Sequence, residues 1–488
     1  IPSSSKMPKI ENRRIRHPLC FLSVFILILA IFLGITNTSY LNHLFRKLSS
    51  THYLTFFPKS NFLNLIPISQ KPHPKKLHDP RSLCVLWMAP FLSGGGYSSE
   101  AWAYILSLNK TLNSSPFRLS IEHHGDAVSQ EFWMGLPLEQ RELAVNLHQE
   151  LCFPNETIVI CHSEPGAWQP PLFQTSPCPL SGYDNYFAVV GRTMFETDRL
   201  TSGHVARCNR MDYVWVPSQF HVSSFVESGV HASKVVRVVQ PVDVEFFNPE
   251  TTEPFNLQGE LVLGSRRIIT KEFVFLSIFK WEERKGWDVL IKAYVSEFTG
   301  EDEVALVLVT KPYHSEGGFS GIISKFVSDC GIVEPEEGWA SVYVISSHIA
   351  QVEMPRLYKS ADAFAVASRG EGWGRPLAEA MAMGLPVIAT NWSGSTEFIS
   401  EDSSYPVKVE KMVEVKEGPF KGHLWAEPSV DHLRGLMRRV VENREEREEK
   451  GRKARKLMED KYSPEIVARV VIHQLQIIVD KAALSKAI

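Results

Sequence analysis

Two glutamates eight positions apart, Glu371 and Glu379, are the residues of this sequence whose type and spacing best suit binding chemistry. A carboxylate accepts hydrogen bonds from two neighbouring hydroxyls, which is what sugar and ribose diols present. Charged residues are mostly exposed, so an arbitrary pair of glutamates is more simply a pair of solvated surface residues. Glu379 differs because its neighbours in sequence are alanines and a methionine, which offer its charge few polar partners. The pair is therefore a candidate site for a hydroxyl-rich ligand.

A strand, a glycine-rich loop and a helix must position the two glutamates. The apolar run Ala363–Ala367 is expected to be a buried strand, and three glycines follow within Gly370–Gly374. Pro376 suits a first helical turn, and the helix formers after it end at Gly384, a typical C-terminal stop. Where such a loop opens onto a helix, free backbone N–H groups and the helix dipole favour an anion.

The stretch EGWGRPLAEAMAMGLPVIAT, which begins at Glu371, resembles the donor-site motif of nucleotide-sugar glycosyltransferases of family four, with two glutamates separated by seven residues. The resemblance implies the α/β fold called GT-B, in which two Rossmann-like domains with parallel sheets face a cleft. It implies that Glu371, a catalytic candidate, and the loop amides of Gly372, Trp373 and Gly374 hold the transferred sugar. It also implies that Glu379 holds the ribose of the donor.

Two lysines, Lys280 and Lys285, lie at a predicted junction of strand and helix. They follow the apolar strand Phe273–Phe279 and precede a helix that begins at Trp287. Compact positive charges beside free amides suit a diphosphate, although most lysine pairs belong to a solvated basic loop. The family carries arginine, four residues and then Lys-Gly here, so Lys280 departs from the pattern and Arg284 is an alternative. The resemblance implies that both lysines bind the donor diphosphate.

The first half of the chain contains a second glycine loop. Ser82–Ala89 is a predicted strand, and Gly94, Gly95 and Gly96 lie between it and a helix expected to reach Leu108. These glycines match neither the dinucleotide fingerprint nor the P-loop pattern, and any tight turn uses such residues. Beside a second Rossmann-like half, the loop resembles the one that faces the donor phosphates in GT-B enzymes. The resemblance thereby assigns Gly95 and Gly96 to the donor site.

Polar residues follow the predicted strand Thr157–Cys161, at the edge where parallel sheets bind ligands. The enzymes that this chain resembles carry a histidine or an acid here, near the transferred sugar, which makes His162 and Glu164 catalytic candidates. The choice between them stays open, and a half-buried histidine bonded to backbone is the alternative for His162. Other polar residues at strand ends are His123, His124, Arg192, Glu196 and Asp198.

Composition limits the class of protein. The 488 residues suffice for two or three domains, and 44% are hydrophobic and 22% charged. A net charge of −3 argues against a nucleic-acid partner. The seven cysteines form no Cys-x-x-Cys motif, so structural zinc is not expected; disulfides are possible within Cys152–Cys208, with the pairing open. Without an Asp-x-Asp signature we expect no cofactor and no obligatory metal.

Residues near the N-terminus predict a membrane anchor. Basic residues precede an apolar run, Leu19–Ile35, which nearly reaches the length of a bilayer span. We therefore expect a cytosolic tail (1–17), a type II signal anchor (18–36) and a stem (37–80), with a cleaved signal peptide as the alternative. The expected protein is a plant-like, membrane-anchored glycoprotein of the Golgi or endoplasmic reticulum with a lumenal catalytic domain. Asn-x-Ser/Thr triplets suit that location and begin at Asn37, Asn109, Asn113 and Asn155.

A linker divides the rest of the chain. Pro241–Pro249 contains two prolines, lacks periodicity and resembles the interdomain connection of the family. We expect an acceptor domain at 81–245 and a donor domain at 246–462. A last helix, capped by Ser463, is expected at 463–488 and should cross back to the first domain, as in GT-B folds.

The predicted function is transfer of a hexose-type sugar from a UDP- or GDP-linked donor to an unidentified glycan, lipid or small-molecule acceptor. Retention of the anomeric configuration is implied by the family resemblance alone. One alternative is a sugar phosphorylase of similar architecture, which uses inorganic phosphate. The other is a non-catalytic, membrane-tethered sugar-binding protein, which the intact pair of Glu371 and Glu379 disfavours.

Overall fold

In a computed structural model, the structure describes residues 83–112, 116–265, 272–311 and 318–487. The predicted tail, span and stem, at residues 1–80, lie outside the described residues. Within the described ranges, no helix is both long enough and apolar enough to cross a bilayer.

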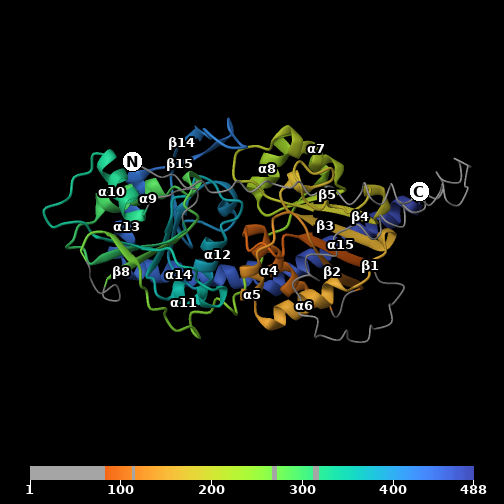
Figure 1. The fold of residues 1–488 in the computed structure, drawn as a ribbon, viewed down its shortest axis with the longest axis horizontal. Helices are drawn as coiled ribbons and strands as arrows, with labels where there is room; N and C mark the ends of the chain where they lie inside the picture. Colours follow the sequence, from red (N-terminus) through yellow and green to blue (C-terminus); the bar gives the residue numbers. More distant parts are fainter. Residues whose placement is uncertain (1–82, 113–115, 266–271, 312–317, 488) are drawn as a thin grey trace, which may run out of the picture. The chain divides into compact units, whose positions relative to one another are not determined.

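The first half of the described chain folds around a parallel sheet with the strand order β2-β1-β3-β4-β5-β6 (Figure 1). β3 is an apolar, largely β-branched run that is buried along its whole length, as a parallel sheet covered on both faces requires. The strand order reverses at β1, so the carboxyl ends of β1 and β3 form a switch point, where such folds bind ligands. The strands are β1 (Leu83–Ala89), β2 (Phe117–His123), β3 (Thr157–His162), β4 (Ala188–Arg192), β5 (Tyr213–Val216) and β6 (Val235–Arg237).

Helices connect these strands, and the last helix of the chain packs against one of these helices. α15 (Pro464–Ala487) packs against α4, and just before it the Val242 N–H donates to the Tyr462 carbonyl. The domain boundaries given above remain predictions. The helices of the first half are α4 (Gly96–Thr111), α5 (Gln130–Gly135), α6 (Leu138–His148), α7 (Ser202–Arg210) and α8 (Gln219–Glu227).

The second half folds around a sheet with the order β13-β12-β11-β8-β9-β10-β7. All its neighbours pair in parallel except β7, which pairs antiparallel with β10 at the edge and departs from the predicted parallel arrangement. The order reverses at β8, which puts a second switch point at the carboxyl ends of β8 and β11. The strands are β7 (Glu260–Leu263), β8 (Phe273–Ile278), β9 (Val304–Val309), β10 (Ser341–Ile345), β11 (Ala363–Val366), β12 (Val387–Thr390) and β13 (Tyr405–Val407).

The core of this half lies on both faces of the sheet. Side chains alternate along β8, so Val274 and Leu276 join one buried cluster and Phe275 joins the other. Trp373 and Leu377 belong to the first cluster, which packs the glutamate-bearing helix on the sheet. The helices are α9 (Trp287–Glu297), α10 (Phe319–Asp329), α11 (Met354–Lys359), α12 (Arg375–Ala382), α13 (Val430–Glu442) and α14 (Arg444–Leu457).

A hairpin and two disulfides complete the described fold. The antiparallel hairpin of β14 (Val409–Glu414) and β15 (Leu424–Pro428) was not predicted. Cys84 pairs with Cys152 and Cys161 with Cys178. The pair Cys161–Cys178 lies within the predicted region Cys152–Cys208, whereas the pair Cys84–Cys152 links that region to β1.

Candidate active site

An ion pair with Lys285 holds Glu371. Lys285 Nζ donates hydrogen bonds to both carboxylate oxygens of Glu371, at 2.6 and 2.8 Å, and Ser368 Oγ donates to one of them at 2.7 Å. The side chains of Lys285 and Glu371 are 15% and 13% exposed. Burial raises the pKa of Glu371, but the charges of Lys285 and Arg284 outweigh burial and bring this pKa below its usual value. Glu371 is therefore an anion that joins the loop after β11 to the turn before α9.

Two glycines allow this close approach. Gly286 follows Lys285 with a φ of 60°, and a Cβ there would collide with the Ala367 carbonyl at the end of β11. Gly374 has a φ of 93° and is the N-cap residue of α12. The backbone at these two positions explains the glycine of the Lys-Gly pattern and the second glycine of the Gly-Trp-Gly pattern.

Three backbone amides of the glutamate loop are unpaired. Gly372, Trp373 and Gly374 are buried, and within the described part of the chain their N–H groups have no hydrogen-bond acceptor. Buried N–H groups are normally paired, so these three are suited to a ligand. They precede the first turn of α12, where the helix dipole adds positive potential. The Trp373 side chain packs on Phe398, so this residue can offer only its amide.

Glu379 is buried in α12 rather than solvated. Tyr358 Oη, from α11, donates to Glu379 Oε2 at 3.0 Å, and Arg375 lies 3.5 Å from Oε1, one helical turn earlier. Burial raises the pKa of Glu379, and Arg375 and Tyr358 offset this only in part. Burial of the charged carboxylate costs free energy, and a ligand hydroxyl that donated a hydrogen bond to it would offset part of that cost.

Lys280 and Arg284 occupy different positions. Lys280 is exposed after β8, and its side chain makes no hydrogen bond or ion pair with other described residues. Arg284 Nη1 donates to the Gly370 carbonyl at 2.7 Å, and Nη2 donates to Glu282 at 2.6 Å. Of the two alternatives, Arg284 is the one that the structure brings to the glutamate loop.

His162 belongs to a buried polar cluster at the first switch point. Its Nδ1 accepts a hydrogen bond from Trp87 Nε1 at 3.0 Å, and its Nε2 lies 3.1 Å from Glu100 Oε2. Because an indole N–H only donates, Nδ1 is the acceptor and we assign the imidazole proton to Nε2, on the side of Glu100. Arg192 Nε donates to the other Glu100 oxygen at 2.9 Å.

This cluster leaves His162 no exposed surface. His162, Glu100 and Arg192 are each at most 1% exposed. Burial raises the pKa of Glu100, but Arg192 and His162 outweigh burial and bring this pKa to about 2. The alternative was a half-buried histidine bonded to backbone, whereas His162 is fully buried and contacts the side chains of Trp87 and Glu100. A structural role fits this geometry, and the catalytic role remains a prediction.

The other predicted residues of the first half are more accessible. The Glu164 side chain is 44% exposed, and Oε1 lies 3.2 Å from His204 Nε2 on α7. The Gly95 N–H donates to Ser93 Oγ at 3.2 Å, and a Cβ at Gly96 would meet nothing within 4 Å. Gly95, Gly96, Glu164 and His162 thus surround the first switch point, whereas the other predicted residues surround the second.

Sequence reasoning missed the residues that support the two glutamates. Tyr358 lies 21 positions before Glu379, beyond any helical spacing that could have indicated the contact. Arg369 precedes the loop and makes paired hydrogen bonds to Asp288 and Glu427. The signal in the sequence was an arginine two residues after a predicted buried strand, because an arginine that is buried there needs carboxylate partners.

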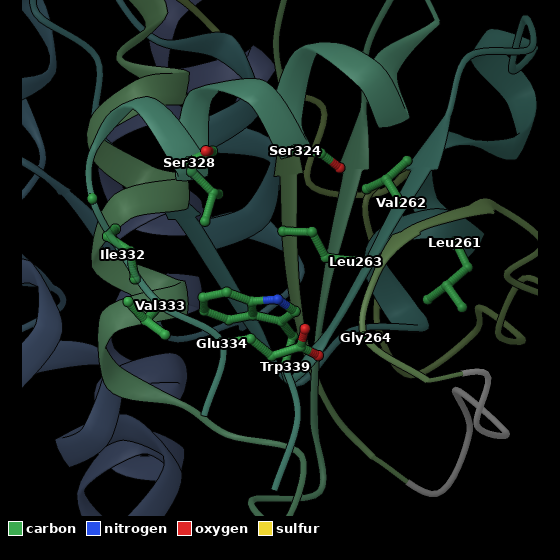
Figure 2. Close-up of a pocket in the computed structure, with 12 residues that line it drawn as sticks. Leu261, Val262, Leu263, Gly264, Ser324, Ser328, Ile332, Val333, Glu334 and Trp339 are labelled. Atoms are coloured by element: carbon green, nitrogen blue, oxygen red, sulfur yellow. The ribbon is translucent and has the colours of Figure 1, made fainter. Parts of the chain in front are cut away.

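A separate cavity of about 610 Å³ lies at the edge of the second sheet (Figure 2). It is lined by β7, by Ser324 and Ser328 of α10 and by Trp339. None of the predicted site residues lines it, so it is not the site described above.

Comparison with solved structures defines the class of fold as GT-B. HepE from Anabaena, in complex with UDP and glucose, aligns with a TM-score of 0.54 at 13% identity, covering 81% of this chain and 99% of HepE. Sucrose-phosphate synthase from Thermosynechococcus elongatus aligns with a TM-score of 0.53 at 14% identity, covering 82% of this chain and all of that one. The predicted GT-B fold is confirmed.

Sequence comparison finds similarity to glycosyl transferases within the second half. Residues 270–415 match the family model described as Glycosyl transferases group 1. GDP-mannose-dependent alpha-(1-6)-phosphatidylinositol monomannoside mannosyltransferase of Mycobacterium tuberculosis is 27% identical over 200 residues, which are 40% of this chain and 47% of the relative. Spore coat protein SA of Bacillus subtilis is 22% identical over 246 residues, 48% of this chain and 60% of the relative. The chain thus spans about half the length of these curated relatives.

The comparisons correct the predicted location. The curated relatives are bacterial proteins, from organisms that have no Golgi, and no described helix is able to span a bilayer. The prediction of a plant-like, type II protein of the Golgi or endoplasmic reticulum is therefore overturned. It depended on the apolar run Leu19–Ile35, on the basic residues before it and on the Asn-x-Ser/Thr triplets, and the run and its basic flank lie outside the described residues.

Proposed function

We propose that this chain is a glycosyltransferase that takes a hexose from a UDP- or GDP-linked donor and transfers it to an acceptor hydroxyl with retention of configuration. The observation that carries the proposal is the set of three amides at the start of α12 that have no acceptor among the described residues, beside the pair of Lys285 and Glu371. The group 1 match over residues 270–415 supports it. So do the donor named for the mycobacterial relative, GDP-mannose, and the UDP and glucose in the HepE complex.

In this proposal the second half binds the donor. The amides of Gly372 to Gly374 hold the transferred sugar beside Glu371, and the α12 dipole stabilises the charge that develops on the departing diphosphate. Lys285 adds a positive charge that the diphosphate shares with Glu371. Glu371 accepts hydrogen bonds from the transferred sugar, and Glu379 accepts them from the ribose.

Binding and hydrolysis test the proposal without a known acceptor. Calorimetry with UDP, GDP, UDP-glucose and GDP-mannose should give one nucleotide series that binds the chain. Slow hydrolysis of the matching nucleotide-sugar should release the sugar first as the α anomer, which proton NMR distinguishes before mutarotation. Release of the β anomer would contradict retention, and failure of all four ligands to bind would contradict the function.

The same assays separate the two alternative functions. A sugar phosphorylase would turn over with inorganic phosphate and ignore the nucleotide. A binding protein without catalysis would bind the nucleotide-sugar and never release free sugar. Addition of phosphate to the hydrolysis assay, with both products monitored, distinguishes all three outcomes.

A further inference from the structure

A short segment of the first half lies against the glutamate loop of the second. The residues that follow β4 approach the loop so closely that a Cβ at Gly372 would lie 2.7 Å from Met194 Sδ. A Cβ at Gly370 would collide with the Glu196 carbonyl oxygen. Phe195, between them, is buried in the core of the first half. The segment therefore presents the Met194 side chain and the Glu196 backbone to the loop that carries Glu371.

Hydrogen bonds hold this segment in place from several directions. Tyr97 Oη, at the start of α4, donates to the Met194 carbonyl at 3.1 Å. His221 Nε2 lies 2.8 Å from the Phe195 carbonyl, and Thr197 Oγ1 lies 2.9 Å from His423 Nδ1. A residue fixed in this way keeps its position when a ligand arrives, which is what a positioning group needs.

The carboxylate of Glu196 is available for a ligand. Glu196 is partly exposed, and among the described residues its side chain has no hydrogen-bond or ion-pair partner. Burial alone would lower the pKa of Arg284. Neighbouring carboxylates outweigh burial and raise this pKa above its usual value, and Glu196 makes the largest contribution among them. Burial raises the pKa of Tyr97, and the charge of Glu196 adds to this rise. The carboxylate thus lies within electrostatic reach of both switch points.

We infer that Glu196 binds the acceptor, and that its carboxylate accepts a hydrogen bond from the attacking hydroxyl and orients that oxygen toward the donor sugar. This inference rests on the proposed function. An unpaired carboxylate repels a diphosphate, whereas a neutral hydroxyl donates to it. Glu371 is less suited to the acceptor because Lys285 already neutralises it.

The chemical step balances without a permanent transfer to Glu196. The acceptor oxygen forms its bond to the anomeric carbon as the bond from that carbon to the diphosphate breaks. The hydroxyl proton, hydrogen-bonded to Glu196 before the step, turns to a diphosphate oxygen during it and leaves on the diphosphate. Glu196 orients the hydroxyl before this step, and orientation of a reactant lowers the barrier without any new covalent chemistry.

Water serves as the probe acceptor, because the natural acceptor is unidentified. The test compares Glu196→Gln, which keeps the size but removes the charge, with Glu227→Gln, an exposed glutamate of α8. Hydrolysis of UDP-glucose or GDP-mannose, whichever the wild type binds, should fall about 10- to 100-fold in Glu196→Gln, the loss expected for one hydrogen bond to a charged group. The Kd of the nucleotide and of the nucleotide-sugar should change less than twofold, and Glu227→Gln should match the wild type.

Three results would overturn the inference. Unchanged hydrolysis in Glu196→Gln would show that the carboxylate does not orient the acceptor. If Glu196→Gln weakened binding of the nucleotide-sugar relative to the wild type but left binding of the nucleotide unchanged, Glu196 would be a contact of the donor sugar instead. A wild type that binds neither nucleotide-sugar would refute the proposed function, and the inference with it. If Glu196→Gln fails to fold, Glu196→Asp keeps the charge but withdraws it by one methylene, and its hydrolysis should fall about 10-fold with the Kd values unchanged.

Discussion

Lys285 donates to both oxygens of Glu371, and this pair bridges the two strand ends that form the second switch point. Lys285 lies in the turn that follows β8, and Glu371 lies in the loop that follows β11. A diphosphate that binds here must share Lys285 with a carboxylate already in place. The predictions for these two residues follow from that competition.

Lys285→Ala should weaken binding of UDP or GDP by about 1.5–3 kcal/mol, the scale of a hydrogen bond with a charged group. Lys292→Ala is the matched control, since it removes the same charge from an exposed position of α9. It should cost less than about 0.5 kcal/mol, as exposed charges usually do. Calorimetry of both variants measures the difference. If both variants lost the same affinity, the lysines would act on the nucleotide only by long-range attraction, which would contradict a direct contact between Lys285 and the diphosphate.

Glu371→Gln and Glu379→Gln should affect different ligands. Glu379→Gln keeps an oxygen for Tyr358 but loses the charge, so it should weaken nucleotide and nucleotide-sugar alike by roughly 1–2 kcal/mol. Glu371→Gln frees Lys285, so the nucleotide should bind at least as well, while hydrolysis of the nucleotide-sugar falls on the order of 100-fold. Calorimetry and hydrolysis assays together separate the two roles. A loss of nucleotide affinity in Glu371→Gln equal to that in Glu379→Gln would refute this division.

His162→Ala should lower the free energy of unfolding by about 2–4 kcal/mol, because it leaves the Trp87 N–H and one Glu100 oxygen without a partner inside the fold. Urea unfolding measures this loss, and His231→Ala, at an exposed position, is the control. The affinity for the nucleotide-sugar per folded molecule should not change. A normal unfolding free energy together with lost hydrolysis would instead support the catalytic role predicted for His162.

Stability should fall in mild acid because of His221. Burial lowers the pKa of His221 to about 4 from an ordinary value of 6.5. The pKa of His221 is lower in the folded than in the unfolded chain. Its contribution to the free energy of unfolding is therefore complete above pH 6.5. It is lost as the pH falls from 6.5 through 4, because the unfolded chain binds the proton more tightly. The loss is roughly 3 kcal/mol at pH 4, at 1.36 kcal/mol per pKa unit. In urea unfolding between pH 7 and 4, His221→Gln should show a shallower pH dependence than the wild type, and an identical slope would contradict this assignment.

Local patterns predicted the elements that carry the second site. The apolar run before Gly370, the glycines of the loop, Pro376 and Gly384 are each interpretable within a few residues, because turns and helix ends depend on local backbone preferences. The structure has β11, the loop and α12 at this place. The GT-B fold was predicted from the resemblance of this motif, and the comparison of folds confirms it.

The sequence by itself thus determined the strands, the loops and the identity of the two glutamates, because those depend on residues that are neighbours along the chain. Only the tertiary structure decided which side chains meet there. Lys285 and Glu371 are 86 positions apart, and Arg192 and Glu100 are 92 positions apart. These contacts depend on which strands are neighbours in each sheet, and strand order is set by the packing of the whole core rather than by any local pattern. The burial of His162 follows from the same cause, since α4 places Glu100 against β3 and β4 and leaves the imidazole no access to solvent.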